Sequence, residues 1–214
     1  MIPKGPIISE GYPLIGVMLV LTVIAIAFGY YYVAVIPFVL ALFFVNFFRN
    51  PKRVIPEGDN LILSPADGKV MDISEVYEDT FLHKPCKKIT IFLSVFDVHA
   101  NRATIDGKIV FRQYTCGGFL PAYKDEVGFE NERHTICIQN DRTSVVVTQI
   151  AGLLARRIVS WTDLDSELER GQLYGMIKFG SCTEIYMDPN TEILVEKGQH
   201  ITAGNVIIGR LPNE

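Results

Sequence analysis

The sequence predicts a mainly β protein (class α+β) in which a domain of short strands follows an N-terminal hydrophobic helical hairpin. Two observations lead to this class. No charged residue occurs in residues 12–48, and from residue 61 onward short apolar runs alternate with turn residues. We therefore expect two domains, a membrane-anchoring hairpin with a basic flank in residues 1–53 and a β domain in residues 54–214.

The charge-free segment is too long for one straight spanning helix, at ~1.5 Å per residue and ~30 Å of hydrocarbon. Residues 29–32, Gly-Tyr-Tyr-Tyr, interrupt it with an aromatic cluster typical of a membrane interface. We expect two helices, at about residues 13–28 and 33–48. Each is near the lower limit of ~17–25 residues for a span, so a re-entrant hairpin stays open. A signal peptide is disfavoured, because the run is too long and lacks an early small-residue cleavage site.

Basic residues flank the hairpin on both sides: Lys4, Arg49, Lys52 and Arg53. The positive-inside rule then places the β domain on the cytoplasmic face of the cell membrane, where the basic flank would attract anionic lipid. The net charge of −4 gives no support for nucleic-acid binding. The four cysteines form no CxxC pair and have no histidine at metal spacing, so we expect reduced thiols and no metal site.

The β domain is expected to follow a linker at residues 56–60. We predict strands at residues 88–93, 135–139, 144–150, 176–187 and 193–195, and one helix at residues 163–170. The dipeptide Asp-Gly occurs in residues 66–70 and again in residues 105–109, which predicts two hairpin turns and hints at an internal repeat. Residues 196–209 resemble the closing hairpin of lipoyl and biotinyl carriers, so a barrel-sandwich arrangement is expected.

The strand predicted at residues 176–187 is interrupted by Gly180 and Ser181. A glycine within a strand usually marks a bulge or a close backbone approach, and its missing Cβ leaves its carbonyl accessible. The adjacent hydroxyl could attack that carbonyl, because an intramolecular nucleophile has a large effective molarity. The resulting ester would break by β-elimination and leave a pyruvoyl group. Gly-Ser alone is unspecific, and a glycine bulge before a hydrogen-bonded serine is the commoner explanation.

Three further residues could take part in this chemistry. His99 follows a predicted strand and could act as general base for a hydroxyl nucleophile. Asp67 could orient the imidazole, although aspartate is also common in such turns for its backbone conformation. Cys182 is a rival nucleophile for which we favour a packing role.

These segments together resemble the short form of phosphatidylserine decarboxylase, a pyruvoyl-dependent family. The resemblance spans residues 61–209 in family order. Its motifs are at residues 64–70, 93–94, 97–99, 130–133, 178–182 and 203–204. Longer members carry a second histidine, three positions after the first, which belongs to the Asp-His-Ser triad of self-cleavage. Arg102 occupies that position here, so the histidine that acts with Asp67 and Ser181 is left open. His134 is a further candidate outside the motif.

The resemblance implies that Ser181 attacks Gly180 and becomes the pyruvoyl cofactor, with His99 as base. Phosphatidylserine in the membrane would form a Schiff base and be decarboxylated to phosphatidylethanolamine by a heterodimer of the two cleaved chains. Whether this heterodimer forms a homo-oligomer is left open. An archaetidylserine decarboxylase stays open, and a pyruvoyl decarboxylase of a soluble amino acid is disfavoured by the hairpin. A lipoyl-like carrier or adaptor would need a lysine in a Met-Lys-Met or Asp-Lys-Ala setting, and neither occurs.

Overall fold

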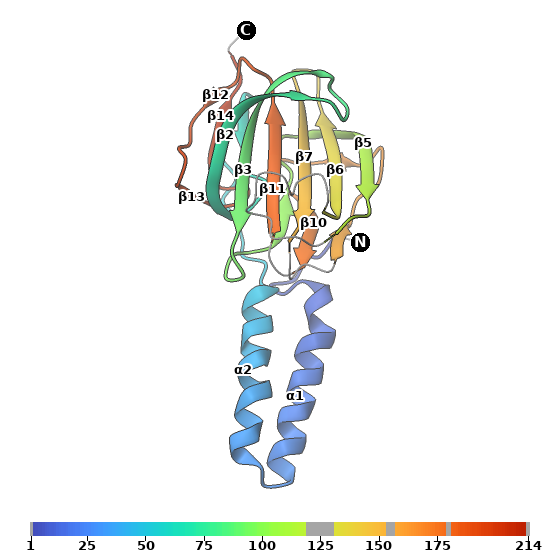
Figure 1. Ribbon diagram of the computed structural model, residues 1–214, viewed down its shortest axis with the longest axis vertical. Helices are drawn as coiled ribbons and strands as arrows, with labels where there is room; N and C mark the ends of the chain where they lie inside the picture. The colour runs from blue at the N-terminus through green and yellow to red at the C-terminus, as the bar shows by residue number, and fades with distance from the viewer. Residues whose placement is uncertain (1, 119–130, 153–156, 179–180, 213–214) are drawn as a thin grey trace. The chain divides into compact units, whose positions relative to one another are not determined.

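The structure is a computed structural model that describes residues 2–118, 131–152, 157–178 and 181–212, with only the backbone considered at residue 181 (Figure 1). The chain divides into two compact units. Residues 3–52 form the first, and the chain from Arg53 onward forms the second.

The first unit is a pair of helices, α1 (Tyr12–Ala27) and α2 (Tyr31–Phe47), preceded by a short 3-10 turn, η1 (Ser9–Gly11). Both helices lie within two residues of their predicted bounds. Backbone hydrogen bonds close the base of the pair, from the N–H of Ile8 to the Phe48 carbonyl (2.8 Å) and from the N–H of Asn50 to the Pro6 carbonyl (2.7 Å). The helical segment Ser9–Ala27 has a mean hydropathy of 2.0 and is long and apolar enough to cross a membrane.

The second unit consists of antiparallel sheets around one apolar core. Two sheets have three strands each. One contains β1 (Leu61–Leu63), β14 (Ile207–Arg210) and β12 (Glu192–Ile193), and the other contains β4 (Ala100–Arg102), β10 (Leu173–Lys178) and β8 (Arg157–Ser160).

The third sheet has eight strands and curves around the core, as Figure 1 shows. Its order is β13 (His200–Ile201), β2 (Gly68–Glu78), β3 (Lys84–Leu93), β11 (Ser181–Met187), β7 (Ser144–Ala151), β6 (Arg133–Gln139), β5 (Gly107–Thr115) and β9 (Glu167–Leu168). The mainly β class and the helical pair are confirmed. The lipoyl-like barrel-sandwich arrangement stays a prediction.

Three local predictions were wrong. The strand expected at residues 176–187 is two strands, β10 and β11, which belong to different sheets. Residues 163–170 form turns and the strand β9 in place of a helix, because Asp165 adopts a left-handed conformation (φ 67°) and β9 pairs with β5. The two Asp-Gly turns do not form hairpins, since each connects strands of different sheets.

The Asp-Gly turns instead mark the internal repeat that the sequence suggested. Gly68 opens β2 and Gly107 opens β5, and an added Cβ at either glycine would collide with a carbonyl oxygen of the neighbouring strand. Both β2–β3 and β5–β6 contain a register shift three residues after the Asp-Gly aspartate. Ahead of the turns, Ile62 of β1 pairs with Gly209, and Asn101 of β4 pairs with Gly175. The two halves of the β unit therefore share one plan, with Ile62 and Asn101 at corresponding positions.

Candidate active site

Ser181 is the first residue of β11, a central strand of the large sheet. Its backbone lies between Leu93 of β3 and Ala151 of β7. Gly180, the other half of the predicted cleavage site, lies outside the described residues. Because β11 is paired along both edges, the backbone that begins at Ser181 has hydrogen-bonding partners on either side.

Two residues of the 130–133 motif hold the strand beside Ser181. Asn131 donates from Nδ2 to the carbonyl of Ala151 (2.8 Å), and the N–H of Ala151 donates to the carbonyl of Glu132 (2.9 Å). The Glu132 carboxylate accepts hydrogen bonds from the Tyr114 hydroxyl and from the N–H of Ile158. Burial, together with this bond to Glu132, raises the pKa of Tyr114. Tyr114 therefore stays protonated as a donor.

His99 is fully buried and lies immediately before β4. Its Nδ1 is 3.0 Å from the carbonyl oxygen of Asp97, and its own carbonyl accepts the N–H of Ile177 (3.1 Å). A carbonyl oxygen can only accept, so Nδ1 carries the proton of the neutral ring. The lone pair is therefore on Nε2, the nitrogen that can take a proton from a hydroxyl nucleophile.

Asp67 is also buried, but its carboxylate is bound elsewhere. Arg53 donates from Nη2 to both carboxylate oxygens (2.9 and 2.7 Å), and the N–H of Ala203 donates to Oδ1 (2.7 Å). Within the described part of the chain, no hydrogen bond joins Asp67 to His99. In the other half of the repeat, the Asp106 carboxylate accepts the N–H of Arg170 (2.8 Å) in the same way. The aspartate of each Asp-Gly turn therefore binds the backbone of a turn that is distant in the sequence.

Arg102, at the position where the resemblance led us to expect a second histidine, lies next to this ion pair. Its Nη1 donates to the carbonyl of Gly171 (2.9 Å), and its backbone N–H donates to the carbonyl of Pro65 (2.9 Å). Burial, followed by the nearby Arg53 guanidinium, lowers the pKa of Arg102 to about 10. Arg102 is thus a cation at neutral pH and cannot serve as a general base there.

His134 is part of a buried polar chain that sequence reasoning did not find. Its Nε2 is 3.2 Å from Nε of Arg112, and its Nδ1 is 3.0 Å from Oε1 of Gln149. Gln149 in turn donates from Nε2 to Oδ1 of Asn101 (2.8 Å), and Asn101 donates from Nδ2 to Oγ1 of Thr183 (3.1 Å). This chain of hydrogen bonds thus ends at Thr183 on β11, two residues after Ser181.

Cys182 is buried in β11, and burial raises the pKa of its thiol. A buried protonated thiol is a poor nucleophile, which favours the packing role. Where the structure is described, no three His, Cys, Asp or Glu side chains are grouped as a metal site would need.

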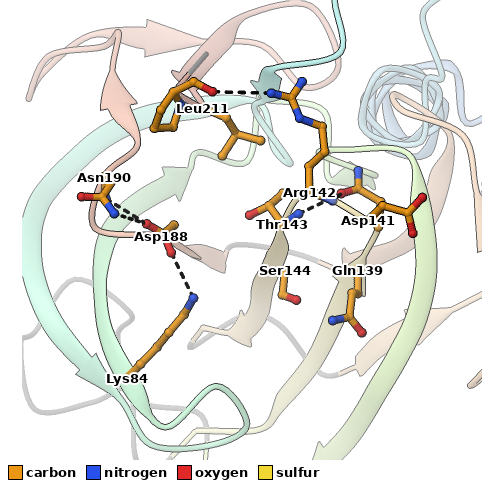
Figure 2. A pocket seen from close by; sticks show the side chains of 11 residues that line it. Lys84, Gln139, Asp141, Arg142, Thr143, Ser144, Asp188, Asn190 and Leu211 are labelled. Carbon is orange, nitrogen blue, oxygen red and sulfur yellow. Dashed lines mark hydrogen bonds and ion pairs between the residues drawn. The ribbon is translucent and has the colours of Figure 1, made fainter. Parts of the chain in front are cut away.

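A cavity of the β unit, about 510 Å³ in volume, is at the other end of these strands (Figure 2). It is polar, and its wall includes an ion pair between Lys84 and Asp188 (3.1 Å). Asp188 follows the last residue of β11, and Ser144 in the cavity wall begins β7. At ~3.3 Å per residue, the cavity is roughly 20 Å along the strands from Ser181 and is not part of the same site.

Comparisons with known proteins agree on one family. Residues 40–209 match the sequence profile of the family described as phosphatidylserine decarboxylase. A phosphatidylserine decarboxylase proenzyme from Carboxydothermus hydrogenoformans is 47% identical, over 97% of this chain and 99% of its own length. A second relative of that name, from Symbiobacterium thermophilum, is 46% identical over 98% of both chains.

Proposed function

Because the chain belongs to the phosphatidylserine decarboxylase family, we propose that it decarboxylates phosphatidylserine after cutting itself between Gly180 and Ser181. The enzyme is then a decarboxylase of phospholipid synthesis that is made as a proenzyme. The word proenzyme in the names of its relatives supports the processing step.

The observation that carries the proposal is the position of Ser181 at the start of β11. A cut before Ser181 releases a new N-terminus but leaves β11 paired with β3 and β7. The same fragment contributes β14, which pairs with β1, and β13, which pairs with β2. The two chains of the proposed mature enzyme would therefore remain associated as a heterodimer.

The proposed cleavage begins when Nε2 of His99 removes the hydroxyl proton of Ser181. The oxygen attacks the carbonyl carbon of Gly180, and the Ser181 nitrogen leaves with a proton, so the peptide bond is replaced by an ester. Loss of the Ser181 α-proton then expels the Gly180 carboxylate. Water hydrolyses the resulting dehydroalanine, with release of ammonia, to an N-terminal pyruvoyl group.

A pyruvoyl group supplies an electrophilic carbonyl, conjugated to an amide, that condenses with the substrate amine and accepts the electrons left by carbon dioxide. The residues in place fit such a group, because β11 fixes the backbone of residue 181 from both sides. His99 would also return a proton to the substrate carbon, since its ring is held by the Asp97 carbonyl.

Asp67 completes the proposed site in a different way from the triad of longer members. It anchors the turn at Ala203, which belongs to the small fragment, to Arg53 of the large one. We assign it a positioning role across the two chains. Orientation of His99 then comes from the Asp97 carbonyl.

The hairpin supports a location on the cell membrane, because a headgroup enzyme must reach the bilayer surface. The basic flank favours a β domain on the cytoplasmic face. The pyruvoyl chemistry involves the serine headgroup and not the tails, so a decarboxylase of ether-linked archaetidylserine is the alternative to this proposal. A lipoyl-like barrel-sandwich is the β architecture that we propose for the curved sheets.

The test is a denaturing gel with intact mass measurement of the purified full chain. We expect fragments of residues 1–180 and 181–214, the second lighter by one ammonia than a serine-started peptide and reactive with a carbonyl reagent. Ser181→Ala should stay whole. Ser144→Ala, at the far end of the neighbouring strand, should be processed normally. A fully active enzyme that runs as one full-length band would refute the proposal.

A further inference from the structure

We propose that Asn101 is a positioning residue of this site, and that it holds β4, the strand that directly follows His99, in a fixed position relative to β11, the strand that begins at Ser181. The inference rests on the proposed function, because it concerns the same cleavage. Asn101 lies outside the residues that sequence reasoning selected.

Asn101 joins two sheets through its side chain alone. It is fully buried in β4, which belongs to the sheet β4-β10-β8. Its Nδ2 donates to Oγ1 of Thr183 (3.1 Å), and its Oδ1 accepts from Nε2 of Gln149 (2.8 Å). Thr183 and Gln149 lie on β11 and β7 of the eight-stranded sheet. Nδ2 of Asn101 donates a second hydrogen bond, to the carbonyl of Pro65 (3.2 Å), so both hydrogens of its NH₂ group have acceptors.

The spacing of these residues matches the spacing of the site. Asn101 is two residues after His99, and Thr183 is two residues after Ser181. Gln149 is two residues before Ala151, which pairs with Ser181. Two residues along a strand span ~6.6 Å. The Asn101 bridge therefore lies two residues along the strands from the nucleophile and from the base. It sets the separation between β4, which follows His99, and β11, which begins at Ser181.

The direction of every hydrogen bond in the buried polar chain that runs from Arg112 to Thr183 follows from the arginine. The guanidinium of Arg112 can only donate, so Nε2 of His134 must accept. Nδ1 of His134 then carries the proton and donates to Oε1 of Gln149. This leaves the Gln149 NH₂ for Oδ1 of Asn101, and the Asn101 NH₂ for Thr183. Each amide has one orientation that satisfies all its partners, and the bridge is rigid for that reason.

The same reasoning removes His134 as a base for Ser181. Its lone pair is occupied by the Arg112 donor, and burial lowers its pKa, which keeps the ring neutral. His134 is therefore the fixed outer support of Gln149, and acts on the site only through Asn101.

The internal repeat shows that the fold itself does not require this amide. Ile62, fully buried, occupies the position of Asn101 in the other half of the β unit. Burying an amide is costly unless all its hydrogen bonds are made, whereas a buried isoleucine has no such requirement. Gly175, the pairing partner of Asn101, leaves room for the Gln149 amide that Asn101 binds, since an added Cβ would lie 3.1 Å from Oε1 of Gln149 and 2.7 Å from the carbonyl oxygen of Val159. The polar bridge is thus confined to the half that contains His99.

The experiment measures the half-time of self-cleavage in the full chain, with thermal unfolding as a check on folding. Asn101→Asp keeps the shape but removes the NH₂ donor, and we expect about 10²-fold slower cleavage, the cost of a small misplacement. The control is Thr148→Val. Thr148 is next to Gln149 on β7 and makes a buried hydrogen bond to Thr135 (3.0 Å) outside the bridge, so its loss should leave the half-time unchanged.

His134→Asn separates positioning from base catalysis. An asparagine NH₂ can replace the Nδ1–H donor to Gln149, so we expect at most about a tenfold loss. Removal of a general base would cost ~10²- to 10⁴-fold. The ¹⁵N NMR shifts of the His134 ring should report a neutral Nδ1–H tautomer in the native protein, a signature that a purely structural histidine need not show.

Wild-type half-times in folded Asn101→Asp would overturn the inference. So would a loss in His134→Asn as large as that in His99→Ala, or an Nε2–H tautomer. If Asn101→Asp does not fold, Thr183→Val decides, because it removes only the bond to β11; normal cleavage there refutes the bridge. A wild-type chain that never cleaves would instead refute the proposed function, and the parallel wild-type sample distinguishes the two failures.

Discussion

Replacing Asp67 by alanine should destabilise the protein far more than the same change at Asp106, its counterpart in the repeat. Asp67 is 5% exposed and accepts two bonds from Arg53 and one from Ala203. Removing it leaves the guanidinium of Arg53, 12% exposed, without its carboxylate. Breaking one partner of a buried pair costs about 3–5 kcal/mol. The Asp106 carboxyl is 63% exposed, so its ion pair with Arg170 contributes about 0–1 kcal/mol.

The assay is urea unfolding of the full chain in detergent, in a Ser181→Ala background. That background keeps the chain uncut, so stability is measured separately from cleavage. Asp67→Asn should fall between wild type and Asp67→Ala, because the amide oxygen can still accept the N–H of Ala203. Cleavage is then followed in chains that retain Ser181. There we expect Asp67→Ala to mature more slowly, in proportion to its loss of stability.

Two results would refute this reasoning. Equal losses at Asp67 and Asp106 would show that the Arg53 pair carries no net stability. A stable Asp67→Ala variant that nevertheless fails to cleave would return Asp67 to the role of a residue that orients His99.

The other predictions concern the base, the anchor and the pH dependence. His99→Ala should slow maturation by ~10²- to 10⁴-fold, and its mature fraction should release less carbon dioxide per pyruvoyl group; normal values of both would exclude His99 as the base. A chain of residues 53–214 should lose membrane attachment and still cut itself, since it retains the Arg53–Asp67 pair; tight binding to vesicles would place the anchor elsewhere. The lowered pKa of His134 means that the folded state binds fewer protons than the unfolded chain, so its stability contribution is complete above the ordinary pKa of 6.5 and declines as the pH falls below it. The melting temperature of the Ser181→Ala protein should therefore fall between pH 6.5 and 5 more than that of Ser181→Ala/His134→Asn.

The helical pair could be predicted closely because its signal is local and strong. A charge-free apolar segment with a Gly-Tyr interruption specifies two helices without reference to the rest of the chain. The strands predicted at residues 88–93, 135–139 and 144–150 lie within β3, β6 and β7, because apolar residues recur along each of them. The pairing partners of the strands could not be predicted. Nothing in residues 176–187 indicates that β10 and β11 join different sheets, because pairing depends on distant segments.

The bridge at Asn101 was missed for a similar reason. An asparagine after a strand-like run usually indicates a turn, and Gln149 and Thr183 alternate with apolar neighbours as any half-buried strand does. The useful signal was the repeat itself. When the two Asp-Gly turns are aligned, Asn101 corresponds to Ile62. A polar residue at the position of a core isoleucine is the anomaly that marks the site.

The central position of β11 also determines the order in which folding and cleavage can occur, and whether the cut protein can refold. A separate fragment of residues 181–214 would have to insert between β3 and β7, which a collapsed sheet would already have brought together. Chain continuity is needed to place the strand, but not to keep it there. Folding must therefore precede scission, and denaturation of the cut enzyme should be irreversible, so that its lifetime is governed by its unfolding rate and not by an equilibrium.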